Sequence, residues 1–461
     1  MNDIIADNIR YAGCYSASMS PNTTIKKAPA SYTAHIQELI RRYEAALQHC
    51  KLKAILLANG QQLPVFMDDQ HYPHKPNPHL LQWLPLFGIA DSWLLYETGK
   101  KPRLILLLAA DYWHATPDLP DESYLQHFEI EIYTEAKQAN RVIAKLPRKT
   151  AVIDPTDAGK HANPERLVHF LHFHRSIKTA YEIDCIKAAS QVAIPAHAAA
   201  KKAFDVGASG FEIHMEFMRA AGCSEHELPY PDIIACNENA AILHYELLTH
   251  EKNPQSLLID AGTAMNGYAS DITRTYSKDS AFNELIDSLE KLQLELCKEI
   301  VPGVSFGNAQ HAAHLGIADI LKQHGVVNME PEAMIVEKVT NIFFPHGLGH
   351  MLGLQVHDMG GHMADTSGKK ALAPKDHPNL RMSRTLQTGM VLTIEPGLYF
   401  VPMLLEQLRN TPESAYVDWA RIEQLATNGG IRIEDNLSVT LDGAENLTRA
   451  AFSDYNQTET L

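Results

Sequence analysis

The chain has 461 residues, 45% of them hydrophobic and 21% charged, so it is long enough for two or three domains with sizeable cores. Its formal net charge of −15 at pH 7 argues against a nucleic-acid-binding protein, which would carry a basic face, and against adhesion to anionic lipid. The six cysteines are scattered without a Cys-x-x-Cys pair, which argues against a disulfide scaffold and a zinc finger.

The scattered cysteines favour the reducing cytosol, and the amino-terminal sequence does not resemble a signal peptide. Its first seven residues include acids where a signal peptide needs positive charge, and no apolar run follows them. The most apolar segment, residues 104–110, is far shorter than the roughly 20 residues that a membrane helix needs. We therefore expect a cytoplasmic protein that has neither a nucleic acid nor a membrane as its partner.

Residues 1–173 are predicted to form a small α/β domain. Apolar residues recur on one helical face between Tyr32 and Cys50, and strand-like runs follow at residues 54–57, 92–96, 103–108 and 151–154. Residues 67–78 contain three prolines and are predicted to be irregular. We interpret this segment either as a plain surface loop or as a lid that reaches a functional site, with Asp68 and Asp69 as its acids.

A second domain is predicted for residues 174–461. It opens with helical patterns at about 180–204 and 210–221, and strand-like runs follow, each ending near a candidate ligand. Asp260 ends one run, Asp271 lies in the next, and Asn266-Gly267 between them signals a hairpin turn. Because ten residues separate the two aspartates, an unbulged hairpin places both on one face, where their repulsion favours a bound cation over two turn-capping acids.

The run from Phe343 to Asp358 packs three histidines, His346, His350 and His357, between glycines that permit a close approach of backbone and ligand. A lone histidine means little in a chain with 24 of them, but these three and His244 stand in unusual settings.

Two glutamates close later apolar runs. Glu395 follows residues 391–394, where Pro396 and Gly397 are expected to stop the strand directly after its acid, and Glu434 follows residues 429–433. A salt bridge is the alternative interpretation for either glutamate alone, since a buried carboxylate is seldom unpaired. Taken together, one imidazole and four carboxylates are the ligands that two neighbouring hard divalent cations require.

These motifs resemble those of the pita-bread metallopeptidases of family M24, strongly over residues 175–450 and more loosely before them. The run from His346 to Asp358 fits the proline-dipeptidase and aminopeptidase P signature at each defined position. Three features are similar to bacterial prolidases, including those described as organophosphorus acid anhydrolases: residues 67–73, the insert 399–428 and the run 429–436. The resemblance implies an α+β, pita-bread (creatinase/aminopeptidase-like) catalytic domain that follows a smaller α/β domain.

The resemblance also implies a role for each candidate residue. Two divalent ions would share five ligands, namely Asp260, Asp271, His350, Glu395 and Glu434. The catalytic candidates are Glu395 as general base and then acid, His244 and His357 as donors to the substrate carbonyl or tetrahedral intermediate, and His346 beside the substrate. The substrate-binding candidates are Arg381, which would hold the terminal carboxylate, Tyr230 in the pocket, and Arg432 on the strand of Glu434.

The resulting hypothesis is a dinuclear-metal dipeptidase that hydrolyses Xaa-Pro dipeptides by a metal-bridging hydroxide, with organophosphate hydrolysis as a side reaction. The carboxylate-rich ligands favour Mn(II), although Co(II) or Zn(II) could occupy them. The alternatives are an aminopeptidase P that acts on longer X-Pro peptides and a non-catalytic pita-bread protein that binds peptides. The family further implies a homodimer or a dimer of dimers, in which the N-terminal domain mediates assembly and Asp68 or Asp69 reaches the neighbouring site.

Overall fold

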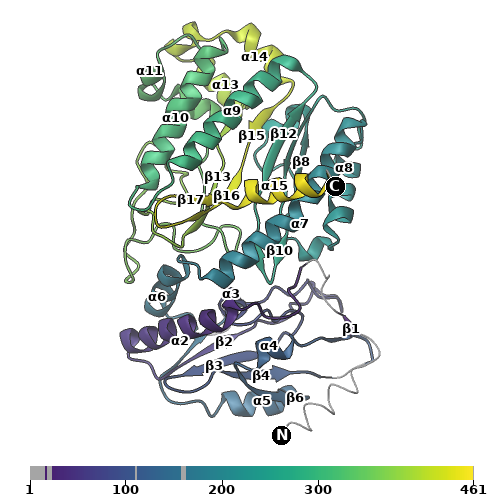
Figure 1. Ribbon diagram of the computed structural model, residues 1–461, viewed down its shortest axis with the longest axis vertical. Helices are drawn as coiled ribbons and strands as arrows, with labels where there is room; N and C mark the ends of the chain where they lie inside the picture. Colours follow the sequence, from purple (N-terminus) through teal and green to yellow (C-terminus); the bar gives the residue numbers. More distant parts are fainter. Residues whose placement is uncertain (1–15, 18–22, 110–111, 157–161, 460–461) are drawn as a thin grey trace. The chain divides into compact units, whose positions relative to one another are not determined.

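The computed structural model describes residues 16–17, 23–109, 112–156 and 162–459 (Figure 1). They form two compact units: an N-terminal unit of Met1–His174, Thr179–Tyr181 and Thr366–Gly368, and a C-terminal unit of Arg175–Lys178, Glu182–Asp365 and Lys369–Leu461. The opening residues, for which the sequence predicts no signal peptide, lie outside the described part. Within the described residues, no helix combines the length and the apolar character that a membrane crossing demands.

A five-stranded mixed sheet in the order β6-β4-β3-β2-β7 forms the N-terminal unit. Its strands are β2 (Ala54–Ala58), β3 (Trp93–Glu97), β4 (Arg103–Leu107), β6 (Glu129–Tyr133) and β7 (Thr150–Ile153). The helices of this part of the chain are α2 (Ser31–Cys50), α3 (Pro78–Leu81), α4 (Glu122–Leu125), α5 (Ala136–Ile143) and α6 (Glu165–Arg175). β2 pairs with β3 antiparallel, whereas β4 pairs with β6 parallel, so the sheet is mixed. The predicted first helix corresponds to α2 and the four predicted strands to β2, β3, β4 and β7, which confirms the α/β character.

The segment predicted to be irregular is ordered at both ends. Tyr72 donates its N–H to the carbonyl of Leu63 at 2.9 Å, so residues 63–72 form a narrow hairpin with an exposed tip. Asp68 and Asp69 lie exposed at that tip. α3 begins at Pro78, because a proline in the first turn of a helix gives up no hydrogen bond. The prediction therefore holds only for the stretch between the hairpin and α3.

Three small antiparallel sheets form the core of the C-terminal unit, in the orders β12-β9-β8, β13-β16-β17 and β14-β15, together with the two-stranded hairpin β10-β11. The strands are β8 (Ile233–Cys236), β9 (Ser256–Asp260), β10 (Ala264–Met265), β11 (Tyr268–Ala269), β12 (Thr273–Ser277), β13 (Val391–Ile394), β14 (Gly397–Tyr399), β15 (Gly430–Arg432), β16 (Asp435–Val439) and β17 (Ala444–Asn446).

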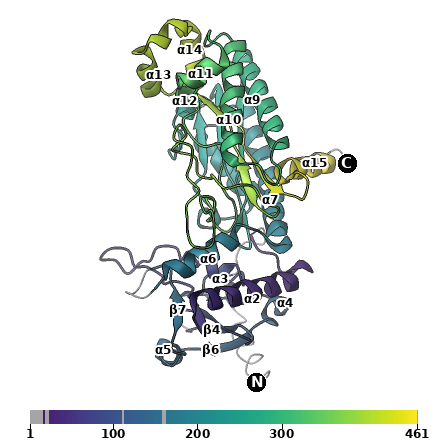
Figure 2. The same cartoon turned by 90° about the vertical axis from the view of Figure 1, so that its left-hand side faces the viewer.

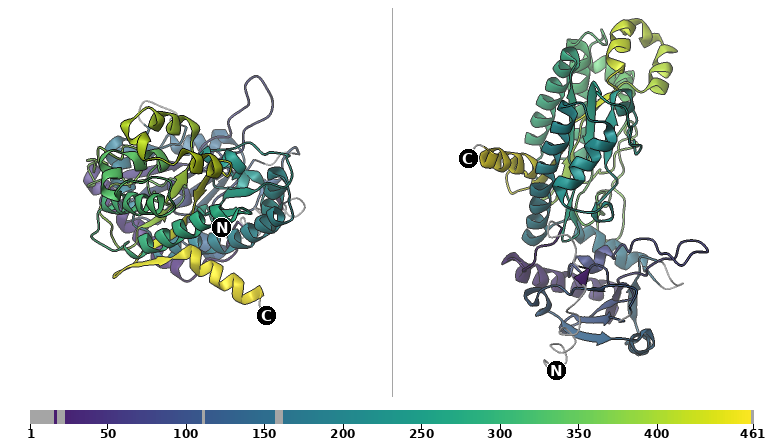
Figure 3. Two further views of the ribbon diagram at one scale, coloured as in Figure 1. Left: turned by 90° about the horizontal axis from the view of Figure 1, so that it is seen from above. Right: turned by 90° about the vertical axis from the view of Figure 1, so that its right-hand side faces the viewer.

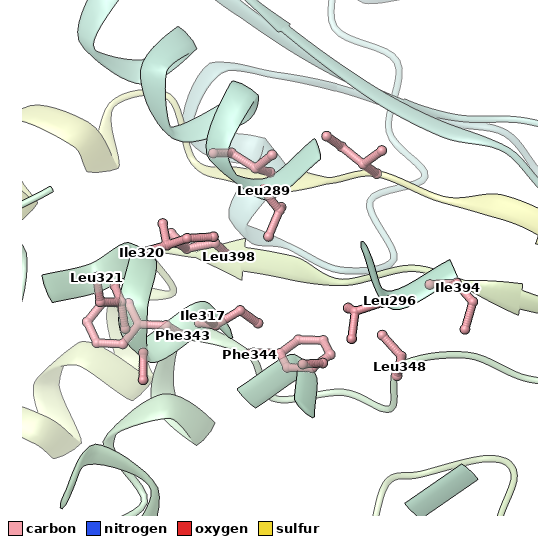
Figure 4. Close-up of a cluster of buried hydrophobic side chains, with 14 of the residues drawn as sticks. Leu289, Leu296, Ile317, Ile320, Leu321, Phe343, Phe344, Leu348, Ile394 and Leu398 are labelled. Carbon is pink, nitrogen blue, oxygen red and sulfur yellow. The ribbon is translucent and has the colours of Figure 1, made fainter. Parts of the chain in front are cut away.

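Two helix pairs pack along these sheets (Figures 2 and 3). α7 (Ala180–Asp205) and α8 (Gly210–Ala221) share a hydrophobic cluster with β8 and β9. α8 begins where it was predicted because Ser209 and Glu212 form a capping box. α9 (Ser280–Lys298) and α10 (Phe306–Gln323) share a larger cluster with β13 and β14, whose buried members include Leu296, Ile317 and Ile394 (Figure 4).

Short helices complete the C-terminal unit: α11 (Pro331–Val336), α12 (Val339–Phe343), α13 (Pro402–Arg409), α14 (Trp419–Ala426) and α15 (Leu447–Glu459). The insert noted in the sequence between β14 and β15 consists of α13, α14 and the 3-10 turn Pro412–Tyr416 between them.

Candidate metal centre

Asp260 and Asp271 share one face of the hairpin that β9 and β12 form, which we call the aspartate hairpin. Asp260 pairs with Thr273, and the register continues through β10 and β11 to a turn in which Asn266 and Gly267 both have positive φ. Asp271 precedes Thr273 by two residues and so points to the same side as Asp260. The predicted turn and common face are confirmed, although Asp271 lies between two strands rather than within one.

Neighbouring hydrogen-bond donors hold both aspartates. The hydroxyl of Tyr230 donates to Oδ1 of Asp260 at 3.0 Å and to Oδ1 of Asp271 at 2.5 Å. Arg432 donates from Nη2 to Oδ2 of Asp260 at 2.7 Å. Burial raises the pKa of Asp260 to about 6, against the pull of Arg432. Burial acts on Asp271 as well, but the hydrogen bond and charge of His350 outweigh it and lower the pKa of Asp271.

Glu395 and Glu434 face one another in a second antiparallel arrangement, which we call the glutamate ladder. β13 pairs with β16 and β14 pairs with β15 in one register, so the break between the two strand pairs places Glu395 opposite Glu434. The two carboxylates therefore come together because of long-range strand pairing and not because of their positions in the sequence.

The sequence-based boundaries at these glutamates were wrong. β13 ends at Ile394, one residue before Glu395, and Gly397 begins β14 instead of terminating a strand. Pro396 explains the break because it has no N–H to donate to the ladder, although its carbonyl still accepts from Ile433. Glu434 likewise occupies a break, between β15 and β16.

A single backbone bridge joins the glutamate ladder to the aspartate hairpin. The N–H of Glu434 donates to the carbonyl of Thr273 at 3.1 Å, and the hydroxyl of Thr273 donates to Oε2 of Glu434 at 2.7 Å. The other carboxylate oxygen, Oε1, is buried and has no hydrogen-bond partner among the described residues. An unpaired buried carboxylate oxygen is costly, so it marks the place where a cation is needed.

His350 completes the cluster from the glycine-rich run. The adjoining Gly349 is required there, because a Cβ would stand 2.0 Å from the carbonyl oxygen of Thr393. Nδ1 of His350 lies 3.0 Å from the carbonyl of Met351, which leaves Nε2 directed at the carboxylates. Nε2 lies 3.3 Å from Asp271, 3.5 Å from Glu395 and 3.9 Å from Glu434.

The residues present fit hard divalent cations. Ligand atoms of Asp271, His350 and Glu434 all lie within 4.8 Å of one another, and all three side chains are buried. Burial raises the pKa of Glu395 to about 7, and burial together with the neighbouring acids raises the pKa of Glu434 far above its usual value. Carboxylates that resist ionisation in this way lack counter-charge, which oxygen-binding cations such as Mn(II) would provide.

Four further predicted residues border the cluster. His346 is half-buried, and its pKa is lowered to about 3 by burial and by the charge of Arg432. His357 keeps part of its surface in solvent, with its ring edge-on to that of His350 at 4.5 Å, and its pKa is lowered to about 4 by the partial burial of the ring and by the charge of His350. His244 and Arg381 are both exposed, and the charge of each acts on both His346 and His357.

Sequence reasoning missed Tyr399, which links two predicted residues. Its hydroxyl lies 2.9 Å from Nε2 of His346 and accepts from Nη1 of Arg432 at 2.9 Å. The signal for it was a pair of glycines. A Cβ would stand 2.4 Å from the tyrosine ring at Gly397 and 2.5 Å from it at Gly430, so the ring fits only if both residues are glycine.

A buried charge cluster at Asp358 was also missed. Its carboxylate bonds Nη2 of Arg175 at 2.5 Å and Nζ of Lys178 at 2.7 Å, and all three side chains are at most 2% exposed. Asp358 follows His357 directly, so the cluster fixes the end of the histidine run. Periodicity could not reveal this contact, because the partners lie 180 and 183 residues away in sequence.

Comparison with known proteins adds a family and a fold. Residues 184–441 match the model of metallopeptidase family M24, and residues 30–173 match that of the Xaa-Pro dipeptidase N-terminal domain. Xaa-Pro dipeptidases of Shewanella woodyi and Shewanella oneidensis are each 42% identical, over 427 and 433 residues respectively, which cover 91% of this chain and 97% of each relative.

Solved structures show the same fold at lower identity. Aminopeptidase P from E. coli in its low-pH form is 23% identical, with a TM-score of 0.68 over 90% of this chain and 95% of that one. Proline aminopeptidase P II from Yersinia pestis is also 23% identical, with a TM-score of 0.67 over 91% and 96% of the two chains. The predicted α+β catalytic domain preceded by a smaller α/β domain is thereby confirmed.

Proposed function

The chain belongs to metallopeptidase family M24, within its bacterial prolidases, and on this premise we propose that it hydrolyses dipeptides of the Xaa-Pro type. One observation carries the proposal: relatives that bear this activity in their names match the chain over nearly its whole length, including the N-terminal unit. The buried group of carboxylates around His350 supplies the matching chemistry.

We propose that the site holds two divalent ions, with Mn(II) favoured by its carboxylate-rich composition. The ligands would be Asp260, Asp271, His350, Glu395 and Glu434. Two bound ions supply a nucleophile activated at neutral pH and a Lewis acid for the scissile carbonyl. The orphaned Oε1 of Glu434 supports this proposal, since a cation would satisfy it.

Glu395 is the proposed proton carrier. The nitrogen of an Xaa-Pro bond has no hydrogen and must be protonated before proline can leave, so a side chain has to deliver a proton to it. Glu395 is held by the hydroxyl of Thr393, which donates to Oε1 at 3.3 Å, while His346 stands 3.8 Å from Oε2. These contacts support a carboxylate that would accept a proton from water and pass it on.

His244 and His357 are proposed to donate hydrogen bonds to the substrate carbonyl as negative charge develops there, a contribution of about 3 kcal/mol for each donor. Both are exposed, and His244 is close enough to His357 to contribute to the lowered pKa of that residue, which supports a shared position at the substrate.

Arg381 is proposed to hold the terminal carboxylate of the dipeptide, which distinguishes a dipeptidase from an aminopeptidase P. Replacing it, as in Arg381→Ala, should weaken dipeptide binding by roughly 10- to 100-fold, the value of a charge-assisted pair of hydrogen bonds, while the metal stays bound. Steady-state kinetics together with metal analysis test this expectation. Unaltered dipeptide kinetics would refute the carboxylate grip.

The assembly and the cellular location are proposals that rest on the family resemblance of the sequence. We propose a homodimer or a dimer of dimers in the cytoplasm, in which Asp68 or Asp69, at the exposed tip of the N-terminal hairpin, reaches the site of a neighbouring copy. Light scattering measures the size of the assembly. The dipeptide kinetics of the Asp68→Ala and Asp69→Ala variants would distinguish the two acids.

The direct test is hydrolysis of Ala-Pro by metal-stripped protein before and after addition of Mn(II), compared with the tripeptide Ala-Pro-Ala. We expect release of proline from the dipeptide only with metal, and little cleavage of the tripeptide. Preference for the tripeptide would identify an aminopeptidase P. An organophosphate such as paraoxon, assayed in parallel, tests the proposed side reaction of the same centre.

A further inference from the structure

Gln310 is a buried glutamine on α10 that touches the histidine run from outside the metal centre. Its side chain is 1% exposed. Oε1 accepts the N–H of Leu348 at 2.6 Å, and Nε2 donates to the carbonyl oxygen of His346 at 3.3 Å. The two bonds lie on either side of Gly347, so a single amide brackets the chain directly after the His346 side chain.

The hydrogen-bond partners fix the orientation of this amide. The N–H of Leu348 requires an acceptor, so Oε1 must face it, and Nε2 then also faces Nε2 of His314 at 3.0 Å. Because the amide nitrogen can only donate, Nε2 of His314 accepts and its proton lies on Nδ1, which bonds the hydroxyl of Thr340 at 2.9 Å. His314 is therefore neutral, and burial lowers its pKa to about 3.

The bracketed segment needs an external support because it has no regular structure of its own. Residues 344–350 lie in neither helix nor strand. α10, by contrast, is a regular helix packed into the large hydrophobic cluster, so it offers a rigid anchor. The carbonyl of Leu348 also accepts the N–H of Glu395 at 2.8 Å, so the peptide that Gln310 holds continues directly to the glutamate ladder.

We propose that Gln310 is a positioning residue for the dipeptidase reaction. By fixing the peptides on both sides of Gly347 it sets the direction of the His346 side chain, which lies against Tyr399 and beside Glu395. His314 serves the same end by locking the amide in one orientation. This inference rests on the proposed function and extends it to a residue that touches neither substrate nor metal.

The test uses Gln310→Met, which keeps the length and volume of the side chain but removes the hydrogen bonds. We expect kcat for Ala-Pro to fall about 10- to 100-fold, since a displacement of about 1 Å beside the reacting atoms has an effect of that size. Metal content should not change. In a His346→Ala background the same substitution should cause a clearly smaller fold loss of kcat, because the side chain that it chiefly positions is absent.

Ile317→Ala is the matched control, because Ile317 is a fully buried residue of the same helix and a member of the hydrophobic cluster. It should lower the melting temperature and leave kcat unchanged. Equal fold losses of Gln310→Met in the wild-type and His346→Ala backgrounds would overturn the proposal, and so would a wild-type kcat in folded Gln310→Met protein.

A second readout keeps the proposal separate from the proposed function. In protein labelled with 13C at histidine Cε1, the His346 resonance, identified by its loss in His346→Ala, should shift in Gln310→Met and stay in place in Ile317→Ala. This holds whether or not Ala-Pro is the substrate. An unmoved His346 resonance in Gln310→Met contradicts the positioning role, whereas absence of dipeptide hydrolysis by wild-type protein contradicts the proposed function alone.

Discussion

The two carboxylate pairs of the centre are held in opposite ways. In the aspartate hairpin, Tyr230 and Arg432 donate hydrogen bonds to the carboxylate oxygens, so the pair is largely satisfied by the protein itself. In the glutamate ladder each acid receives one hydroxyl donor, from Thr273 or Thr393, and one oxygen of Glu434 receives none among the described residues. The fold therefore supplies more hydrogen-bond donors to the first pair of carboxylates than to the second.

This difference suggests that the two carboxylate pairs depend on bound metal to different degrees. A pre-bonded hairpin can hold its geometry before metal arrives, because its donors compensate the buried charge. The glutamate ladder has fewer donors for its buried acids, so we expect metal binding and local stability to be coupled there.

The strongest test of the comparison changes one of two candidate ligands: His350, which contacts both pairs of carboxylates, or Asp271, which belongs to one of them. His350→Ala and Asp271→Asn should each abolish most metal binding and lower kcat for Ala-Pro by about three orders of magnitude, the scale of losing a catalytic group. Metal analysis of the purified variants and kinetics with added Mn(II) measure this. His226→Ala, an exposed histidine outside the site, is the control. Full activity with unchanged metal content in either ligand variant would refute the assignment.

A second test compares how one substitution in each pair changes the free energy of unfolding of the metal-free protein near pH 7.5. Asp260→Asn should lower the free energy of unfolding by about 3–5 kcal/mol, because Arg432 is left buried without its partner charge. Glu434→Gln should instead raise it by about 1–3 kcal/mol, because it removes a buried acid whose Oε1 has no hydrogen-bond donor among the described residues. Both variants should lose activity. Denaturant melts that show the same sign for both substitutions would remove the distinction between the pairs.

The smallest effect should come from Tyr230→Phe. Loss of the hydroxyl leaves Asp260 and Asp271 without their common donor, so the metal-free protein should lose about 1–2 kcal/mol of unfolding free energy. Metal should compensate most of that loss, since both aspartates then have a cation. A melting temperature that falls equally with and without Mn(II) would show that the tyrosine acts on packing and not on the aspartates.

Local patterns predicted much of this architecture. The helices α2, α7 and α8 follow from apolar periodicity, and the common face of Asp260 and Asp271 follows from an even spacing around an Asn-Gly turn. Both are properties of a single stretch of chain, which is why one sequence suffices to find them.

The parts that failed depend on distant partners. The breaks at Glu395 and Glu434 exist because two strand pairs share one register across a proline. The sequence of either strand alone does not predict that pairing. Gln310 and Asp358 look like an ordinary helix residue and an ordinary loop acid until the fold brings the histidine run beside them. Contacts between segments far apart in sequence leave no periodic trace.

The charge cluster at Asp358 has a consequence for dissecting the chain. Arg175 and Lys178 precede every strand and nearly every helix of the C-terminal unit, yet their cations neutralise a carboxylate next to His357. A truncated polypeptide that starts at Ala180 would keep all the candidate metal ligands and still bury a lone anion behind the histidine run. The minimal autonomous fragment must therefore begin at or before Arg175, several residues ahead of where helix boundaries alone would suggest cutting.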